Sequence, residues 1–282
     1  MAGNEVNMPF IRNLASSDRK TRTAALDSLK TFLGAPTTTS RLGPLDFLKL
    51  WKGLYYSLWM CDRPIPQQNL CADLADLMTV LPEPAVAPWL CAFWETLGRE
   101  WTSIDALRLE KFLLLARRVL GASLAWVTST MPPPSPPPSE APTTAEAKEA
   151  KAMARRHARK VDVLVETLAA WPLDADGDLS RVPVGLRLHV LDIWVDEAAK
   201  LGLLDAKKTG EAGRQFLDRI GLLVEAQTRS TCKPVRLRAK ESLADDRLPW
   251  NADEAGDDEV GKTVTGFAKD SDDKASWDGF DD

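Results

Sequence analysis

Lysine and arginine gather in two short stretches of this chain, and the chemistry available to them is contact with phosphate. Residues 148–160 and residues 229–240 each carry a net charge of +5. Helical spacing places most cations of the first stretch along one broad side of a helix. Such a side would contact nucleic-acid backbones in a salt-sensitive way, without reading base sequence. The cations are Lys148, Lys151, Arg155, Arg156, Arg159 and Lys160 in the first stretch, and Arg229, Lys233, Arg236, Arg238 and Lys240 in the second.

Two other interpretations of these cations stay open, a solvated helix face and a nuclear import signal. The net charge of the whole chain, −5, does not decide between them. Residues 251–282 hold eleven Asp and Glu against three Lys, so this segment carries −8 and the remainder of the chain +3. A nucleic-acid partner is therefore compatible with the acidic pI.

Sequence motifs give no support for an enzyme or a metal site. The chain contains no GxGxxG phosphate loop and no GxSxG nucleophile elbow; the string GDDEVGKT at residues 256–263 fits GxxxxGK[ST], but it lies in the acidic segment without the preceding apolar strand that a phosphate loop needs. The four cysteines form no CxxC pair, so we expect neither a zinc site nor disulfides, and a reducing compartment. The run DADGD at 174–178 superficially resembles a calcium loop but lacks the glutamate at position twelve. We expect no catalytic residue, metal, cofactor or small-molecule substrate.

The histidines and tryptophans give a further set of expectations. His189 lies in an apolar helical stretch and is expected to be hydrogen-bonded in the core, whereas His157 lies among cations and is expected to be solvated. Of the ten tryptophans, Trp51, Trp89 and Trp94 fall on apolar faces typical of core residues. Trp59 and Trp101 stand beside charged residues at expected helix ends, where a half-exposed indole either completes the fold or anchors a partner.

Helical periodicity runs through nearly the whole chain, and strand signals are almost absent. Successive short-looped helices predict an all-α fold, specifically an irregular HEAT- or armadillo-like α-solenoid of helical hairpins. No apolar run approaches the ~18 residues of a membrane span, and the N-terminus lacks a secretory signal. The expected helices are 9–14, one starting after Ser17 as N-cap and stopped by Gly34, 44–62, 67–80, 84–100, 103–128, 144–171, 184–201, 210–227 and 234–248.

Composition divides the chain into four parts. Residues 1–129 and 146–248 form two helical halves, and residues 249–282 an acidic tail with a composition typical of disorder. Between the halves, residues 130–145 contain two PPP triplets and are interpreted as an exposed loop or linker, with a docking motif for an aromatic groove as the alternative. Whether the halves form one continuous solenoid or two hinged pieces stays open.

Three long strings of residues resemble the ribosomal RNA processing protein 1 family. They are LDFLKLWKGLYYSLWMCDRP (45–64), FWETLGREWTSIDALRLEKFLLLARRVL (93–120) and VGLRLHVLDIWVDEAAKLG (184–202), and the resemblance extends over about residues 8–227. Matching positions are Trp51, Lys52, Trp59, Asp62, Arg63, Arg99, Trp101, Asp105, Arg108 and Lys111. Five of them, Trp59, Asp62, Arg63, Arg99 and Trp101, are candidate partner-binding residues. The spacing of residues 105, 108 and 111 favours an intrahelical salt ladder.

The resemblance implies a non-catalytic nucleolar assembly factor of the large (60S) ribosomal subunit. Family members assist processing of precursor rRNA at its internal transcribed spacers, within early pre-60S particles and with other assembly factors. This chain departs from animal relatives, which continue with a long basic extension, so any RNA contact is expected in its helical body. Our first hypothesis is a scaffold that touches precursor rRNA through phosphates. The alternative is an armadillo-type protein–protein adaptor without direct RNA contact; neither hypothesis includes a membrane.

Overall fold

The computed structural model describes residues 10–133, 144–175, 179 and 181–252, and all regular structure in this part of the chain is helical. The all-α expectation is therefore confirmed. The helices are α1 (Phe10–Leu14), α2 (Arg19–Leu33), α3 (Pro36–Thr39), α4 (Pro44–Trp59), α5 (Pro64–Asp76), η1 (Leu77–Val80), α6 (Glu83–Glu100), η2 (Trp101–Ser103), α7 (Ala106–Thr128), α8 (Thr144–Ala170), α9 (Val184–Lys200), α10 (Ala206–Gln227), α11 (Lys233–Leu243) and α12 (Pro249–Ala252).

Helix starts differ from the sequence-based expectation where two capping residues compete. Asp18 caps α2 in place of Ser17, because its carboxylate accepts the Thr21 N–H at 2.8 Å. A carboxylate at this end also interacts favourably with the helix dipole. Likewise α7 begins after Asp105, which accepts the Arg108 N–H at 3.0 Å, and residues 101–103 form a separate turn. In α10 a helical turn precedes the expected start, and Gly210 (φ 60°) kinks the junction.

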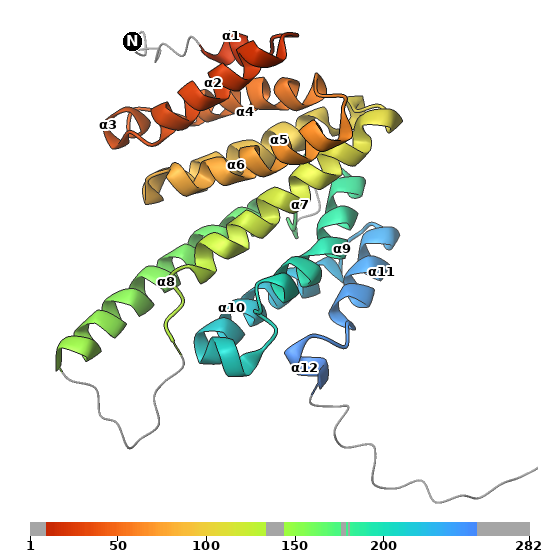
Figure 1. Ribbon diagram of the computed structural model, residues 1–282. Coiled ribbons are helices and arrows are strands. Elements are labelled where there is room, and N and C mark those ends of the chain that lie inside the picture. Colours follow the sequence, from red (N-terminus) through yellow and green to blue (C-terminus); the bar gives the residue numbers. More distant parts are fainter. Residues whose placement is uncertain (1–9, 134–143, 176–178, 180, 253–282) are drawn as a thin grey trace, which may run out of the picture.

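The helices stack in two parallel columns (Figure 1). In one column α4 packs on α6, α6 on α8 and α8 on α10; in the other α5 packs on α7, α7 on α9 and α9 on α11. Helices α1 and α2 cover the end formed by α4 and η1. Within a column each inner helix therefore buries one face against the preceding helix and one against the next, and the columns are joined where α7 packs on α8 and α10 on α11. These contacts continue from α6 and α7 to α8 and α9, across the proline-rich segment.

One cluster of buried apolar side chains extends from Phe10 to Leu248. Aromatic residues fill its N-terminal part, where the Trp51 indole donates to the Trp89 carbonyl at 3.0 Å and packs on Phe93 at 4.8 Å between ring centroids. The core role expected for Trp51 is confirmed, since its side chain is 1% exposed.

Several sequence-based expectations concern residues outside the described part of the chain. The proline-rich segment is described only to residue 133 and again from 144, and most of the DADGD run, residues 176–178, is also outside. The segment assigned to the acidic tail is described only through 249–252, which form α12; there the Trp250 indole lies 3.3 Å from the Leu243 carbonyl. A search of the described helices finds none long and apolar enough to cross a membrane.

Candidate RNA- and partner-binding surfaces

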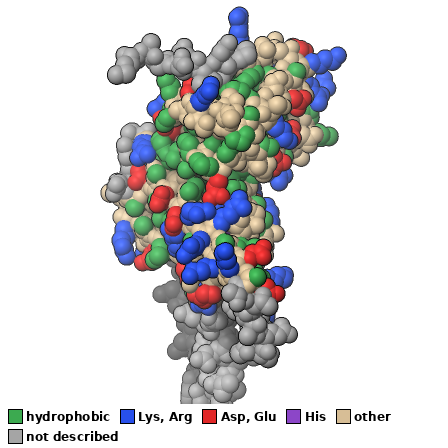
Figure 2. Space-filling view, turned by 90° about the vertical axis from the view of Figure 1, so that its left-hand side faces the viewer, with side chains coloured by type: hydrophobic (Ala, Val, Ile, Leu, Met, Phe, Trp, Pro, Cys, Tyr) green, Lys and Arg blue, Asp and Glu red, His purple; other side chains and the backbone are tan. Residues whose placement is uncertain are grey.

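The first half of α8 projects from the helical stack, and residues 145–156 are exposed on every side of the helix. Lys148, Lys151 and Arg155 lie here, and none of the three has an ion pair with another described residue. Arg156 and Arg159 share Glu83 of α6, at 3.1 and 3.6 Å, but their side chains remain 56% and 67% exposed. We call these five cations the α8 strip. Figure 2 views the molecule from the side on which α8 begins, and blue side chains gather in the lower half of that face.

Lys160, the sixth cation predicted for this surface, is not available to a phosphate. Its side chain is turned into the fold and is 3% exposed. The ammonium donates to the Trp126 carbonyl at 2.8 Å and to Ser129 Oγ at 3.0 Å, and lies 4.6 Å from the centre of the Trp126 ring. Burial lowers the pKa of Lys160, and the neighbouring Arg156 adds to the effect. Lys160 therefore joins α8 to the end of α7.

His157, one turn earlier, also corrects an expectation. It is 5% exposed instead of solvated, and its Nδ1 lies 3.3 Å from the Val127 carbonyl. Burial lowers the pKa of His157, against the opposing effect of nearby backbone carbonyls, so the ring is predominantly neutral at pH 7. The expectation for His189 holds, since its Nε2 lies 2.9 Å from the Leu113 carbonyl.

The second basic stretch, residues 229–240, is largely engaged within the protein. Arg236 donates to the carbonyls of Ser230 and Thr231 at 2.7 and 2.9 Å, at the start of α11. Arg238 pairs with Asp192 of α9, and Arg229 pairs with Glu225 of α10. Only Lys233 and Lys240 of this stretch are exposed without such a contact among the described residues. Three cations of the α8 strip, Lys148, Lys151 and Arg155, are thus the larger unpaired set among the described residues.

The first two signature strings meet in space, where the end of α4 packs beside the start of α7. The Trp59 indole is half-buried there, and the Arg108 guanidinium lies 4.8 Å from the centre of its ring. Arg108 also pairs with the capping carboxylate of Asp105, which confirms one step of the expected salt ladder. Beneath them Tyr55 stacks on Phe112 with ring centroids 4.6 Å apart.

Lys111 does not continue that ladder, which corrects the prediction. Its side chain is directed inward from α7, and the residue is 4% exposed. The ammonium donates to the carbonyls of Trp59 and Cys61 at 2.8 and 3.0 Å, and lies 3.4 Å from Oδ1 of Asp62. A cation at these carbonyls complements the negative end of the α4 dipole. Burial lowers the pKa of Lys111, and Asp62 opposes that effect.

The remaining candidate partner-binding residues divide into one that packs within the fold, Trp101, and three that are exposed, Arg99, Asp62 and Arg63. Trp101 contacts the second helical half, because its Nε1 lies only 2.9 Å from where a Cβ at Gly185 of α9 would be. Arg99 is exposed and pairs with Glu95 on its own helix. Asp62 and Arg63 are both exposed between α4 and α5.

Sequence reasoning missed three exposed apolar side chains in the same strings. Leu107 is 94% exposed, Met60 44% and Tyr56 39%. Each lies next to a signature residue or one helical turn from it, so its position within the strings could have identified it as a candidate. We define the signature surface as the exposed parts of Tyr56, Trp59, Met60, Asp62, Leu107 and Arg108.

Comparison with known sequences decides the family. A family model described as "Nucleolar protein, Nop52" matches residues 5–278. The chain belongs to this nucleolar protein family. Ribosomal RNA processing protein 1 homolog A of Mus musculus is 33% identical over 210 residues, which cover 73% of this chain and 37% of that protein. The Homo sapiens homolog A is 30% identical over 210 residues (73% and 39%), and the Drosophila melanogaster homolog 34% over 229 residues (79% and 29%).

These matches confirm the family resemblance and the nucleolar location predicted from the sequence. The chain spans between 29% and 39% of the length of these three relatives. The third signature string, residues 184–202, covers α9 of this Nop52-family chain, so the three strings lie mainly in α4, α6, α7 and α9.

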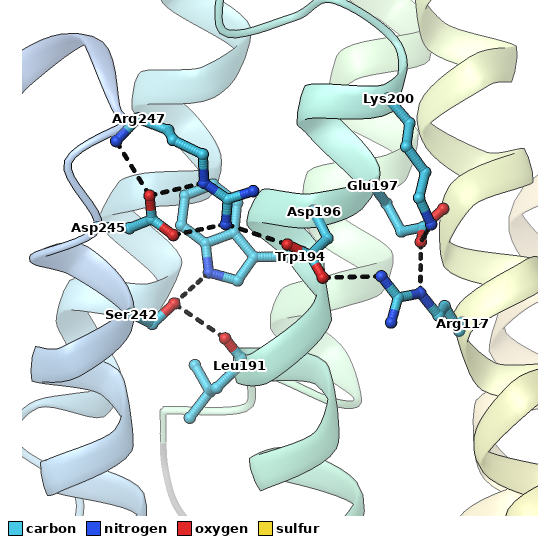
Figure 3. Close-up of polar contacts among 9 residues, drawn as sticks. All are labelled: Arg117, Leu191, Trp194, Asp196, Glu197, Lys200, Ser242, Asp245 and Arg247. Carbon is cyan, nitrogen blue, oxygen red and sulfur yellow. Dashed lines mark hydrogen bonds and ion pairs between the residues drawn. The ribbon is translucent and has the colours of Figure 1, made fainter.

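An ion-pair network joins α7, α9 and the segment after α11 in the Nop52-family chain (Figure 3). Arg117 donates to Asp196 at 2.8 Å and to Glu197 at 2.6 Å. The other oxygen of Asp196 accepts Arg247 at 3.0 Å, and Arg247 also holds Asp245 at 2.7 Å. Burial alone would raise the pKa of Asp196, but the hydrogen bonds from Arg247 and Arg117 hold it below its usual value. The network stabilises the C-terminal helices against the rest of the stack.

Replacing Asp196 by asparagine should lower the melting temperature at pH 7 and flatten its pH dependence. A depressed pKa means that the contribution of Asp196 is fully present above its unfolded-state pKa and is lost as pH falls from there through the lower folded-state value. The measurement is the melting temperature across that range. Asp246→Asn, at an exposed neighbouring position, is the matched control. Parallel pH profiles for Asp196→Asn and the unaltered chain would contradict the assignment.

Within the described residues, no group of three or more His, Cys, Asp and Glu side chains is arranged to hold a metal ion. Asp174, the first residue of the DADGD run, lies instead against Arg187, with its carbonyl accepting from the guanidinium. What the described surfaces offer chemically is therefore cationic contact on α8 and apolar contact at the signature surface.

Proposed function

We propose that this Nop52-family protein is a non-catalytic assembly factor of the large ribosomal subunit, acting as a scaffold in early pre-60S particles during pre-rRNA processing. The names of its relatives, ribosomal RNA processing protein 1 homologs, support a role in rRNA processing. The main support for an RNA contact is the exposed first half of α8, where Lys148, Lys151 and Arg155 have no ion-pair partner among the described residues. Cations left free on a projecting helix can each neutralise a phosphate.

A scaffold needs a long surface, and the two-column stacking of helices supports one. Helices that stack one on the next in this way are typical of HEAT- and armadillo-like solenoids, and we propose that architecture here. We propose further that the halves before and after the proline-rich segment act as one body, since α6 and α7 pack on α8 and α9. Binding energy would then be spread over surfaces on several helix pairs.

The signature surface favours a protein partner, and it is compatible with the adaptor alternative. An exposed leucine, methionine and tyrosine beside a half-buried tryptophan form the kind of cluster that anchors protein interfaces. Asp62 and Arg108 would supply charges at its rim. We propose that other assembly factors of the pre-60S particle dock here. A pure adaptor would use this surface and leave the α8 strip solvated.

The test compares RNA affinity of the unaltered chain with that of the triple variant Lys148→Glu, Lys151→Glu, Arg155→Glu, across salt concentrations. Each phosphate contact contributes about 0.7–0.9 to the slope of log affinity against log salt, so losing three should reduce the slope by about 2. The variant should melt as the unaltered chain does, because these side chains are exposed. Precursor rRNA segments of the large subunit are the probe.

A matched control makes the same change of charge elsewhere. Arg19→Glu, Lys20→Glu, Arg41→Glu alters three exposed cations at the opposite end of the stack. It should leave the salt slope close to that of the unaltered chain. Equal slopes for all three proteins would refute the α8 contact and favour the adaptor.

A further inference from the structure

An apolar pocket of about 180 Å³ opens between α8 and α10, beside the α8 strip. Its walls include Ala154, His157 and Ala158 from α8 and Phe216 from α10. Residues three and four apart share a helix face, so Lys151 and Arg155 border the alanines of the pocket. One face of α8 thus presents an apolar hollow edged by free cations. This arrangement fits an aromatic side chain flanked by carboxylates.

The chain itself contains a segment of that chemistry. Residues 253–282 carry a net charge of −8 and end in the sequence SWDGFDD. Trp277 and Phe280 are each followed by aspartate, and no other thirty residues of this chain are so acidic. The negative charge of this segment therefore complements the cations of α8, and its aromatic residues match the apolar pocket.

The geometry of attachment allows this segment to reach the pocket. It follows α12, which comes directly after α11, and α10 packs against both α11 and α8. Packed helices lie about 8–10 Å apart, so α8 is two helix spacings from α11. A flexible thirty-residue chain has a root-mean-square span of about 30 Å. A tether whose length matches the distance gives an effective concentration near the millimolar range.

We propose that residues 253–282 dock on α8 of their own chain, with Trp277 in the α8–α10 pocket and the neighbouring aspartates on Lys148, Lys151 and Arg155. The docked segment occupies the cations that the proposed function assigns to RNA, so it would compete with RNA for them. This competition rests on the proposed function, whereas the docking itself does not. Precursor RNA must then displace an internal competitor. A longer RNA competes better than a short one, because its phosphates contact several of these cations at once.

Zero-length carbodiimide coupling of the full chain tests the docking without RNA. The reagent joins a carboxylate to a lysine amine only when the two are in contact. We expect adducts between residues 253–282 and Lys148 or Lys151, within one chain, that decline as salt is raised from 50 to 500 mM. Trp277→Ala should reduce their yield severalfold. Lys148→Arg, Lys151→Arg keeps the charge, removes the reactive amines and defines the background.

Three results would overturn the docking: no adducts, adducts confined to Lys233 and Lys240 of α11, or adducts only between isotopically distinct copies. A separate measurement addresses the consequence. Changing Asp270, Asp272, Asp273, Asp278, Asp281 and Asp282 to asparagine should tighten RNA binding about tenfold. Unchanged affinity would refute the competition. If neither protein binds RNA while the adducts form, the proposed function fails and the docking stands.

Discussion

Replacing Arg187 by leucine is expected to lower the free energy of unfolding by about 3 kcal/mol. The Arg187 side chain is completely buried, and its guanidinium donates to the Val182 carbonyl at 3.2 Å and to the Asp174 carbonyl. It also lies 3.3 Å from the side-chain oxygen of Gln227, at the end of α10. Leucine would leave these acceptors buried without a donor, and that desolvation penalty dominates the loss.

Denaturant unfolding followed by circular dichroism measures the effect. Arg214→Leu removes an exposed arginine from α10 and should change stability by less than about 0.5 kcal/mol. Arg187→Lys should fall between the two, because an ammonium restores the charge but not the planar array of donors. If Arg187→Leu unfolds at the same denaturant concentration as Arg214→Leu, the guanidinium does not organise the connection between α8 and α9.

Periodicity predicted most of the helices because their apolar faces repeat along the chain, as in α4 and α9. It could also have found Arg187, whose neighbours at i+3, i+4 and i+7 are Val190, Leu191 and Trp194. All three are buried, so a charged residue on their face must point inward.

The acceptors of these inward charges could not be predicted in the same way. Arg187 binds carbonyls of the segment between α8 and α9, and Lys160 binds the Trp126 carbonyl and the Ser129 hydroxyl at the end of α7. Such pairings depend on which helix ends lie next to each other in the fold. The spacing of residues within one helix does not determine this. For the same reason the α8 strip was predicted with six cations, and the packing of α8 on α7 leaves five at the surface.

Replacing Lys111 by methionine is expected to destabilise the fold by about 2–3 kcal/mol. Methionine fills a similar volume, so the change removes the charge and the donors while creating little cavity. The carbonyls of Trp59 and Cys61, at the end of α4, would lose a common donor. Arg118→Met, on an exposed part of α7, is the matched control and should be nearly neutral.

The same variant separates two roles within the signature strings. If Lys111 supports the surface that Trp59 and Met60 present, Lys111→Met should weaken binding of a pre-60S partner as well as stability. Leu107→Ser changes a side chain that is 94% exposed, so it should weaken partner binding and leave stability unchanged. Loss of stability in Leu107→Ser, or full partner binding by both variants, would contradict this division. A signature string can thus combine an internal cation that joins two helices, Lys111, with an exposed leucine that is available to a partner, Leu107. Only the packing of α4 on its neighbours distinguishes these two roles.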